Sequence, residues 1–451
     1  MLKNMEEKRT FPRVKANLKL GISKNISGQT LDLSETGLNF NCPETITSPK
    51  IEVRFAFPDD GLEFKTDARL VWKRSIEDGS YSYGVEFIDL KENQKAELRR
   101  ELIKTQIQPL LDALTVSEVK QQIEDFFLRD MLVYISEIIK LVADIYKIKN
   151  YSEEIEKRID HLHTQILLKG YCLEEMLSDK AIMQKVKDNF RQLVGAWIYK
   201  SEIVKRAFEK PRGYPGDYRM IETVYDTKPL SKNIVGIYFD NNFLKSPYAV
   251  AVRIRKDRLR EMLLKFINEA KLNKVRILDI ACGSCRELKE LLPNLKTKSQ
   301  VVFSCLDWDE EALDFSRDLL LPGAPKNTEF KFIKEDIMNI AKSEAAAKSL
   351  GQHDFIYSIG LIDYLPDRVL KKLILALYNL LPKGGQLVLT HKNKEKTFPP
   401  IPPDWFCDWK FVPRNKKETI KLFYDCGMAE FFLSTESDDF GYIFYFRITK
   451  K

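Results

Sequence analysis

The chain has 451 residues, of which 44% are hydrophobic and 31% charged, and its net charge of +7 comes from 73 basic and 66 acidic side chains. This length predicts two to four domains, and the mild basic excess is compatible with anionic ligands but does not favour a nucleic-acid-binding protein. Because no apolar run approaches the roughly 20 residues of a membrane span and the N-terminus lacks the apolar core of a signal peptide, we expect a cytoplasmic protein without stable membrane insertion.

Residues 1–92 contain many short runs rich in β-branched and aromatic residues, such as KIEVRFAF at 50–57 and YSYGVEF at 81–87. Turn-forming clusters at 58–61 and 77–80 separate these runs. Short strands at regular spacing predict a small antiparallel β-barrel.

From Lys91 to about Ala270 apolar residues recur at three- and four-residue spacing, which predicts helices. The break is Gly-Tyr-Pro-Gly-Asp-Tyr at 213–218, which cannot be helical throughout, so we expect the preceding helix to end near Lys210. After Lys274 strands and helices alternate, which predicts a Rossmann-like α/β domain with a parallel sheet covered on both faces. Residues 429–435 and 441–450 are expected to close this sheet as an antiparallel pair.

The stretch ILDIACGSCREL at 277–288 combines a strand, a tight turn with a C-x-x-C pair and a helix. A thioredoxin-type redox site has the same order, but that small fold does not continue through several more strand–helix units. Zinc needs more ligands than one C-x-x-C supplies, and no second pair lies at suitable spacing, so we predict no metal. The cysteines are expected to be free thiols.

A nucleotide-type site accounts for more of the positions. The first strand ends at Asp279, the second at Asp307 and the third at Asp336, and acidic strand ends of this kind accept hydrogen bonds from ribose hydroxyls or an amino group. Helix N-termini and loop amides favour polar acceptors and anions. The predicted cofactor site consists of Asp279, Ala281, Gly283, Asp307, Trp308, Asp336 and Ile337. The alternative is that each aspartate only caps the following helix.

These segments, with KEDI and LLPKGGQLVLT, resemble the motifs of class I S-adenosylmethionine-dependent methyltransferases. The departure is the loop, where Gly283 stands alone in place of a glycine-rich run. A narrower resemblance from about Pro211 to the end, carried by PRGYPGDYRMIETVYD, ACGSCRE and SIGLIDYLPD, is to proteins that make the methyl ester of 3-hydroxypalmitic acid.

This resemblance implies that residues 213–218 fold over cofactor and substrate, although a plain helix-joining turn is the alternative. A carboxylate nucleophile needs placement and exclusion of water rather than a strong base. The candidate catalytic or orienting residues are Tyr214, Asp217, Tyr218 and Tyr364, with Arg212 and His391 as further anchors. Phe398, Trp405 and Phe406 are candidates for an acyl pocket or for a surface loop with packed aromatic residues.

Arg9 and Arg13 form an R-x-x-x-R pair before the first strand, and Asp32-Leu33-Ser34-Glu35-Thr36-Gly37 follows the second. Together these motifs resemble the PilZ domain, which binds cyclic di-GMP. Arginine can pair with phosphate or guanine, Asp32 and Ser34 offer hydrogen bonds to a guanine edge, and Gly37 permits the turn. A solvated basic arm is the alternative reading of the arginine pair alone.

The sequence thus predicts a PilZ-like barrel at 1–100, a helical connector at 101–210 and a class I methyltransferase at 211–451. The expected function is cyclic di-GMP-responsive methyl transfer from S-adenosylmethionine to a small acyl substrate, with the dinucleotide acting through the connector or a dimer partner. Alternatives are a non-catalytic effector that uses the methyltransferase fold as a scaffold, and methylation of an amine or a protein. The amphipathic connector is compatible with a homodimer and equally with packing inside one chain.

Overall fold

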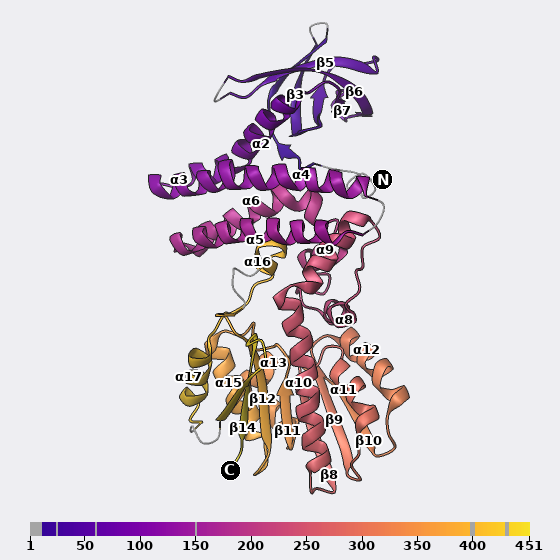
Figure 1. The fold of residues 1–451 in the computed structure, drawn as a ribbon, viewed down its shortest axis with the longest axis vertical. Coiled ribbons are helices and arrows are strands. Elements are labelled where there is room, and N and C mark those ends of the chain that lie inside the picture. The colour runs from indigo at the N-terminus through magenta and orange to yellow at the C-terminus, as the bar shows by residue number, and fades with distance from the viewer. Residues whose placement is uncertain (1–10, 24–25, 59–60, 149–150, 397–401, 429–432) are drawn as a thin grey trace. The chain divides into compact units, whose positions relative to one another are not determined.

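The computed structural model describes residues 11–23, 26–58, 61–148, 151–396, 402–428 and 433–451 (Figure 1). The chain divides into two compact units. The first consists of Met1–Ser201 with Ser231–Phe239, and the second of Glu202–Leu230 with Asp240–Lys451. No helix within the described ranges has both the length and the apolar character that crossing a membrane requires.

The first unit contains an antiparallel sheet that closes into a barrel. Its strands are β1 (Val14–Lys15), β2 (Lys19–Ile22), β3 (Ile26–Ser34), β4 (Gly37–Cys42), β5 (Lys50–Ala56), β6 (Glu63–Ser75) and β7 (Tyr81–Phe87). The order β3-β2-β5-β6-β7-β4 closes because β4 pairs with both β7 and β3, while β1 is added to β3. Side chains alternate along β5, where Ile51, Val53 and Phe55 are buried, as the barrel prediction requires. The predicted barrel is confirmed.

The rest of the first unit is helical, as the three- and four-residue spacing predicted. Its elements are α2 (Glu92–Asp112), α3 (Ser117–Asp125), η2 (Phe126–Met131), α4 (Leu132–Lys147), α5 (Glu153–Met176) and α6 (Lys180–Ile198). Arg99 of α2 makes a bidentate ion pair with Glu35 in the β3–β4 turn, with Nε–Oε2 and Nη2–Oε1 distances of 2.8 and 2.7 Å. Both side chains are largely buried, so this pair attaches α2 to the barrel.

The second unit contains a seven-stranded sheet in the order β10-β9-β8-β11-β12-β14-β13. Its strands are β8 (Lys274–Ile280), β9 (Gln300–Asp307), β10 (Thr328–Lys334), β11 (Phe355–Ser358), β12 (Gln386–Lys392), β13 (Leu433–Ser437) and β14 (Ile443–Thr449). The first five are parallel, and β14 pairs antiparallel with β12 and β13. The predicted parallel sheet with an antiparallel closing pair is confirmed. Residues 429–432, at the start of the predicted closing strand, lie outside the described residues.

Helices cover both faces of this sheet. The helices of the second unit are α7 (Glu202–Glu209), α8 (Tyr218–Asp226), α10 (Pro247–Glu269), α11 (Arg286–Leu291), η3 (Leu292–Asn294), α12 (Glu310–Leu320), η4 (Leu321–Gly323), α13 (Ile337–Lys342), α14 (Glu344–Ser349), α15 (Asp367–Asn379), α16 (Pro402–Cys407) and α17 (Lys416–Asp425). Helix α9 (Ile234–Lys245) starts in the first unit and ends in the second. Helix α7 ends one residue before Lys210, as the break at 213–218 predicted.

Strand β8 shows how this sheet divides two cores. Val275 and Ile277 pack with α10 and α11, whereas Leu278 and Ile280 pack with α13 and α15. A strand buried on both faces is rich in apolar residues on both sides, and VRILDI follows this pattern except at the exposed Arg276 and at Asp279. Asp279 lies near the carboxyl end of this strand, where the two apolar cores end at the edge of the sheet.

Candidate functional site

A cavity of about 700 Å³ lies in the second unit at the carboxyl ends of β8, β9, β10 and β11. Ligands of open α/β sheets bind in this position, and cavities of roughly 300–1,000 Å³ hold drug-sized molecules. The lining comes from the segments after these four strands, from residues between 210 and 225, and from Arg255, Asp408 and Lys410. All seven predicted cofactor residues line the cavity: Asp279, Ala281, Gly283, Asp307, Trp308, Asp336 and Ile337.

The loop after β8 takes a glycine-like path although it holds one glycine. Ala281, Gly283 and Cys285 have φ values of 55°, 56° and 50°, all in the left-handed region. Non-glycine residues adopt this region rarely and at a cost of about 1–3 kcal/mol each, and such strain gathers at ligand sites. The small residues at 281 and 285 thus stand in conformations that glycine would adopt more easily.

Asp307 joins the loops after β8 and β9. Its Oδ2 accepts a hydrogen bond from the Gly283 amide at 2.9 Å, and its Oδ1 accepts one from the Asp309 amide at 3.0 Å. Burial raises the pKa of Asp307, and the two amide bonds partly offset this effect. A carboxylate offers about four lone-pair positions, so Asp307 keeps acceptor capacity while it lines the cavity.

Asp336 lies after β10, and its Oδ1 accepts from the Met338 amide at 2.8 Å, which makes it the N-cap of α13. Asp336 is therefore a helix cap, as the alternative interpretation proposed, and it also lines the cavity. At the corresponding place after β9, the cap of α12 is Asp309 rather than Asp307.

The segment around Tyr214 lies along one side of the cavity. Tyr214 contacts the Trp308 ring at a centroid distance of 5.6 Å, and burial followed by nearby carboxylates raises its pKa. Arg212 Nε donates to Asp309 Oδ2 at 2.9 Å, which ties the segment to the loop after β9. Tyr218 also lines the cavity and accepts a hydrogen bond from Arg219.

Two of the other predicted orienting residues take different positions. Tyr364 lines the cavity and accepts a hydrogen bond from Trp409 Nε1 at 2.9 Å. Asp217 is buried outside the lining, because it caps α8 through the Met220 amide and pairs with Arg206 at 2.6 Å.

The further anchors and the acyl-pocket candidates lie away from the lining where they are described. Arg212 forms ion pairs with Asp309 and Glu311. His391 is buried between Asp363 and Arg414. Trp405 and Phe406 are buried and do not line this cavity, and Phe398 lies outside the described residues.

A buried acidic pair, Asp279 and Glu287, lines the cavity, and the sequence predicted Asp279 but not Glu287. Glu287 of α11 accepts a hydrogen bond from Tyr357 at 2.8 Å. Burial, followed by the neighbouring acidic group and thiol, raises the pKa of Asp279 well above its usual value. Burial likewise raises the pKa of Glu287 to about 8. Glu287 therefore keeps its proton at neutral pH, and burial shifts the pKa of Asp279 in the same direction.

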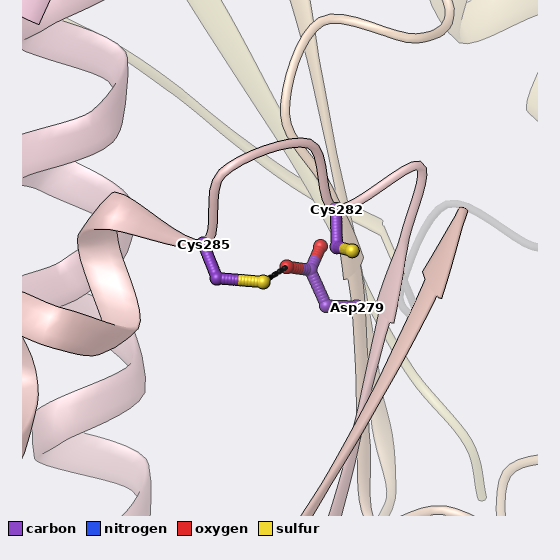
Figure 2. A group of neighbouring side chains, drawn as sticks. All are labelled: Asp279, Cys282 and Cys285. Atoms are coloured by element: carbon purple, nitrogen blue, oxygen red, sulfur yellow. Dashed lines mark hydrogen bonds between the residues drawn. The ribbon is translucent and has the colours of Figure 1, made fainter. Parts of the chain in front are cut away.

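Figure 2 shows the Asp279 carboxylate turned toward the thiol of Cys285, with Cys282 on the same loop. The three side chains offer ligand atoms within 4.8 Å of one another. Neither cysteine of this loop forms a disulfide. Asp279 and Cys282 line the cavity, whereas Cys285 is fully buried behind the lining.

The motif residues of the barrel come together at β1 and β3. Arg13 forms an ion pair with Asp32, whose other oxygen accepts from Asn39 at 3.0 Å. Arg13 and Asp32 remain about one quarter exposed. Arg9 lies outside the described residues.

Ser34 and Gly37 shape the turn itself. The Ser34 hydroxyl donates to the Gly37 carbonyl at 3.1 Å. A Cβ at position 37 would lie 2.1 Å from the Val85 carbonyl oxygen, so close packing of β4 on β7 requires glycine there. Ser34 is buried, and its hydroxyl is used within the turn.

The acidic pair gives a pH prediction for the stability of the folded chain. An unfolded glutamate releases its proton near pH 4.5, whereas folded Glu287 keeps it until about pH 8. The folded state therefore binds more protons between these values, and its stability should fall as the pH rises, by up to about 1.4 kcal/mol per pH unit.

We expect Glu287→Gln to flatten this dependence in calorimetric melting of the full chain between pH 5 and 8.5. Glu329→Gln is the control, because this exposed side chain lies on the edge strand β10, and it should keep the wild-type profile. Parallel profiles for wild type and Glu287→Gln would contradict the assignment.

Comparison with known proteins identifies two domains in the chain. Residues 5–104 match the PilZ domain family, and residues 213–394 match a family described as putative methyltransferase. No curated protein sequence matches the chain significantly.

Three solved structures are similar to parts of the chain. A possible exported protein from Bordetella parapertussis has 18% identity and a TM-score of 0.41, covering 63% of this chain and 86% of its own. Magnesium protoporphyrin IX methyltransferase from Synechocystis PCC 6803 with bound SAM has 14% identity and a TM-score of 0.32, covering 45% and 83%. The CurJ carbon methyltransferase has 14% identity and a TM-score of 0.40, covering 78% and 99%.

The family matches agree with the two architectures already described, since the first covers the closed barrel and the second covers most of the parallel sheet and the cavity lining. The chain therefore combines an N-terminal PilZ domain with a putative methyltransferase domain.

Proposed function

We propose that the chain is a methyltransferase that uses S-adenosylmethionine, responds to cyclic di-GMP, and methylates the carboxylate of a fatty-acid-like substrate. The observation that carries the enzyme assignment is the cavity at the ends of four parallel strands, in which Asp307 joins two loops and keeps acceptor capacity. The domain limits, the cytoplasmic location and a homodimer remain predictions from the sequence.

The charges of the cavity support a cationic cofactor. Its acidic lining residues are Asp279, Glu287, Asp307, Glu335, Asp336 and Asp408, and its basic ones are Lys210, Arg255 and Lys410. Lys210 and Lys410 both pair with Asp408, at 2.7 and 3.3 Å. The acidic excess suits a ligand that carries a sulfonium and an ammonium group.

When bound, S-adenosylmethionine supplies a methyl group already activated by the sulfonium. The residues of this chain then need to hold the two reactants in line and exclude water, and positioning of this kind can contribute about 7–11 kcal/mol. In this proposal Asp307 accepts the ribose hydroxyls, and Tyr214 with Trp308 covers the adenosine. Tyr218 and Tyr364 present polar groups beside apolar surface for an acyl carboxylate. No strong base is required, because a carboxylate is ionised at neutral pH.

The barrel is the proposed receptor for cyclic di-GMP. Arg13 and Asp32 lie together and partly exposed, where a phosphate and a guanine edge could replace their mutual ion pair. Binding would then bias the helical part of the chain, and the resulting coupling to cofactor binding must be reciprocal.

The cofactor site predicts the behaviour of Asp307→Ala. Two hydrogen bonds from hydroxyls to a charged acceptor contribute about 1.5–3 kcal/mol each, so calorimetric titration should show at least a 100-fold loss of S-adenosylmethionine affinity. Asp314 lies on the following helix and pairs with Arg317, so Asp314→Ala should bind the cofactor like wild type. Wild-type affinity in folded Asp307→Ala, or no binding by the intact protein at millimolar cofactor, would instead favour the non-catalytic scaffold.

The receptor site predicts that Arg13→Ala lowers cyclic di-GMP affinity about 10- to 100-fold, because a bidentate charged contact to phosphate or guanine is lost. Arg54→Ala is a matched control on β5, where the arginine pairs with Glu52. Titration of both variants with the dinucleotide separates a local contact from a general effect of positive charge. Equal losses in the two variants would argue against the motif as the binding site.

A further inference from the structure

Arg255 is the buried cation of the cavity, and neither motif nor spacing pointed to it. It lies on α10, is 5% exposed, and lines the cavity with Tyr225, Gly360 and Tyr364. The guanidinium lies against the backbone of Gly360, where a Cβ would fall 2.4 Å from Nη2 and 2.6 Å from Cζ. A side chain at position 360 would displace this guanidinium, and the φ of 85° there also favours glycine.

The acidic partner of Arg255 among the described residues is already shared. Arg255 Nη1 donates to Asp363 Oδ2 at 3.0 Å, and the same oxygen accepts from Lys392 Nζ at 2.8 Å. The other oxygen of Asp363 accepts from the Lys392 amide at 2.9 Å and lies 2.9 Å from His391 Nδ1. One buried carboxylate therefore faces two cationic side chains.

The surrounding groups do not supply the missing negative charge. Arg414, which contacts His391, has its own partner in Asp367 at 2.7 Å. Burial lowers the pKa of Lys392 to about 8, with Arg255 adding to this effect and Asp363 opposing it. Arg255 Nε is buried and has no hydrogen-bond partner within the described part of the chain. Buried charges are normally paired, and an unpaired donor on such a group costs free energy.

We infer that Arg255 is the carboxylate anchor of the cavity: its guanidinium binds the carboxylate of a ligand and so completes the charge balance around Asp363. Guanidinium and carboxylate match as a planar pair, which makes a carboxylate the chemistry this site selects. This inference rests on the proposed function, which provides two carboxylates, one on the methionine part of the cofactor and one on the acyl substrate.

The test uses the full chain and two pairs of ligands that differ in one carboxylate. The first pair is S-adenosylmethionine and its decarboxylated form, and the second is 3-hydroxyhexadecanoic acid and its methyl ester. Calorimetric titration compares wild type, Arg255→Gln, which removes the charge, and Arg255→Lys, which keeps it. Arg258→Gln is the matched control, since Arg258 lies on the same helix, is half exposed and pairs with Glu436.

If the cofactor supplies the carboxylate, Arg255→Gln should weaken S-adenosylmethionine about 10- to 100-fold and leave the decarboxylated form unchanged. If the substrate supplies it, the same loss should fall on the acid and not on its ester, with unchanged cofactor affinity. Arg255→Lys should retain part of the affinity in either case, and Arg258→Gln all of it.

The inference is overturned if folded Arg255→Gln binds both carboxylates as tightly as wild type. Should that variant fail to fold, the wild-type comparison decides alone: at least a tenfold preference for one carboxylate ligand over its partner without the carboxylate supports the anchor, and no preference in either pair refutes it. A wild-type chain that binds no S-adenosylmethionine but binds the acid through Arg255 would sink the proposed function and keep the anchor. If the chain binds both the cofactor and the acid, and neither affinity depends on Arg255, the anchor is rejected and the proposed function is kept.

Discussion

The cavity depends on the carboxylate of Asp307, which accepts one amide from the loop after β8 and one from the loop after β9. Parallel strands bring their carboxyl ends to one edge of a sheet, but the loops that follow them need a connection to form a single wall. Asp307 provides that connection from a buried position. Ala281 and Cys285 accept left-handed conformations nearby, so the loop keeps its path with one glycine.

The cavity combines a mostly acidic lining with one buried cationic side chain. Its lining carries more acidic than basic side chains, and burial raises the pKa values of Asp279 and Glu287, an effect that a neighbouring cation would oppose. Arg255 is the exception, held against Gly360 and sharing Asp363 with Lys392. A ligand that is cationic at one end and bears a carboxylate at another meets both conditions, as does a cationic cofactor together with an acidic substrate.

The sequence was informative where a local pattern determines a local structure. Alternation and turn clusters predicted the barrel, and apolar runs ending in Asp279 and Asp307 predicted the parallel sheet and the edge where its cavity lies. The pattern could not separate cap from ligand: Asp217 is buried as a cap and ion-pair partner, and Asp336 both caps a helix and lines the cavity.

Residues brought in by tertiary packing were harder to find. Arg255 and Glu287 lie within amphipathic helices, where a charged side chain usually points to solvent, and only the fold shows that both are buried. The close contact of Arg255 with Gly360 joins positions 105 apart in the chain, and no local signal indicates it. His391 was chosen by residue type alone, and its burial beside Asp363 could not be anticipated from the sequence.

The most direct test of the account is transfer of a labelled methyl group from S-adenosylmethionine to 3-hydroxyhexadecanoic acid by the full chain, measured with and without cyclic di-GMP. The account predicts label in an alkali-labile ester, formed at a rate that changes when the dinucleotide is added. Absence of labelled ester under both conditions, from a chain shown to bind S-adenosylmethionine and the acid, would contradict carboxyl methylation. Ester formed at one rate regardless of cyclic di-GMP would contradict the regulation.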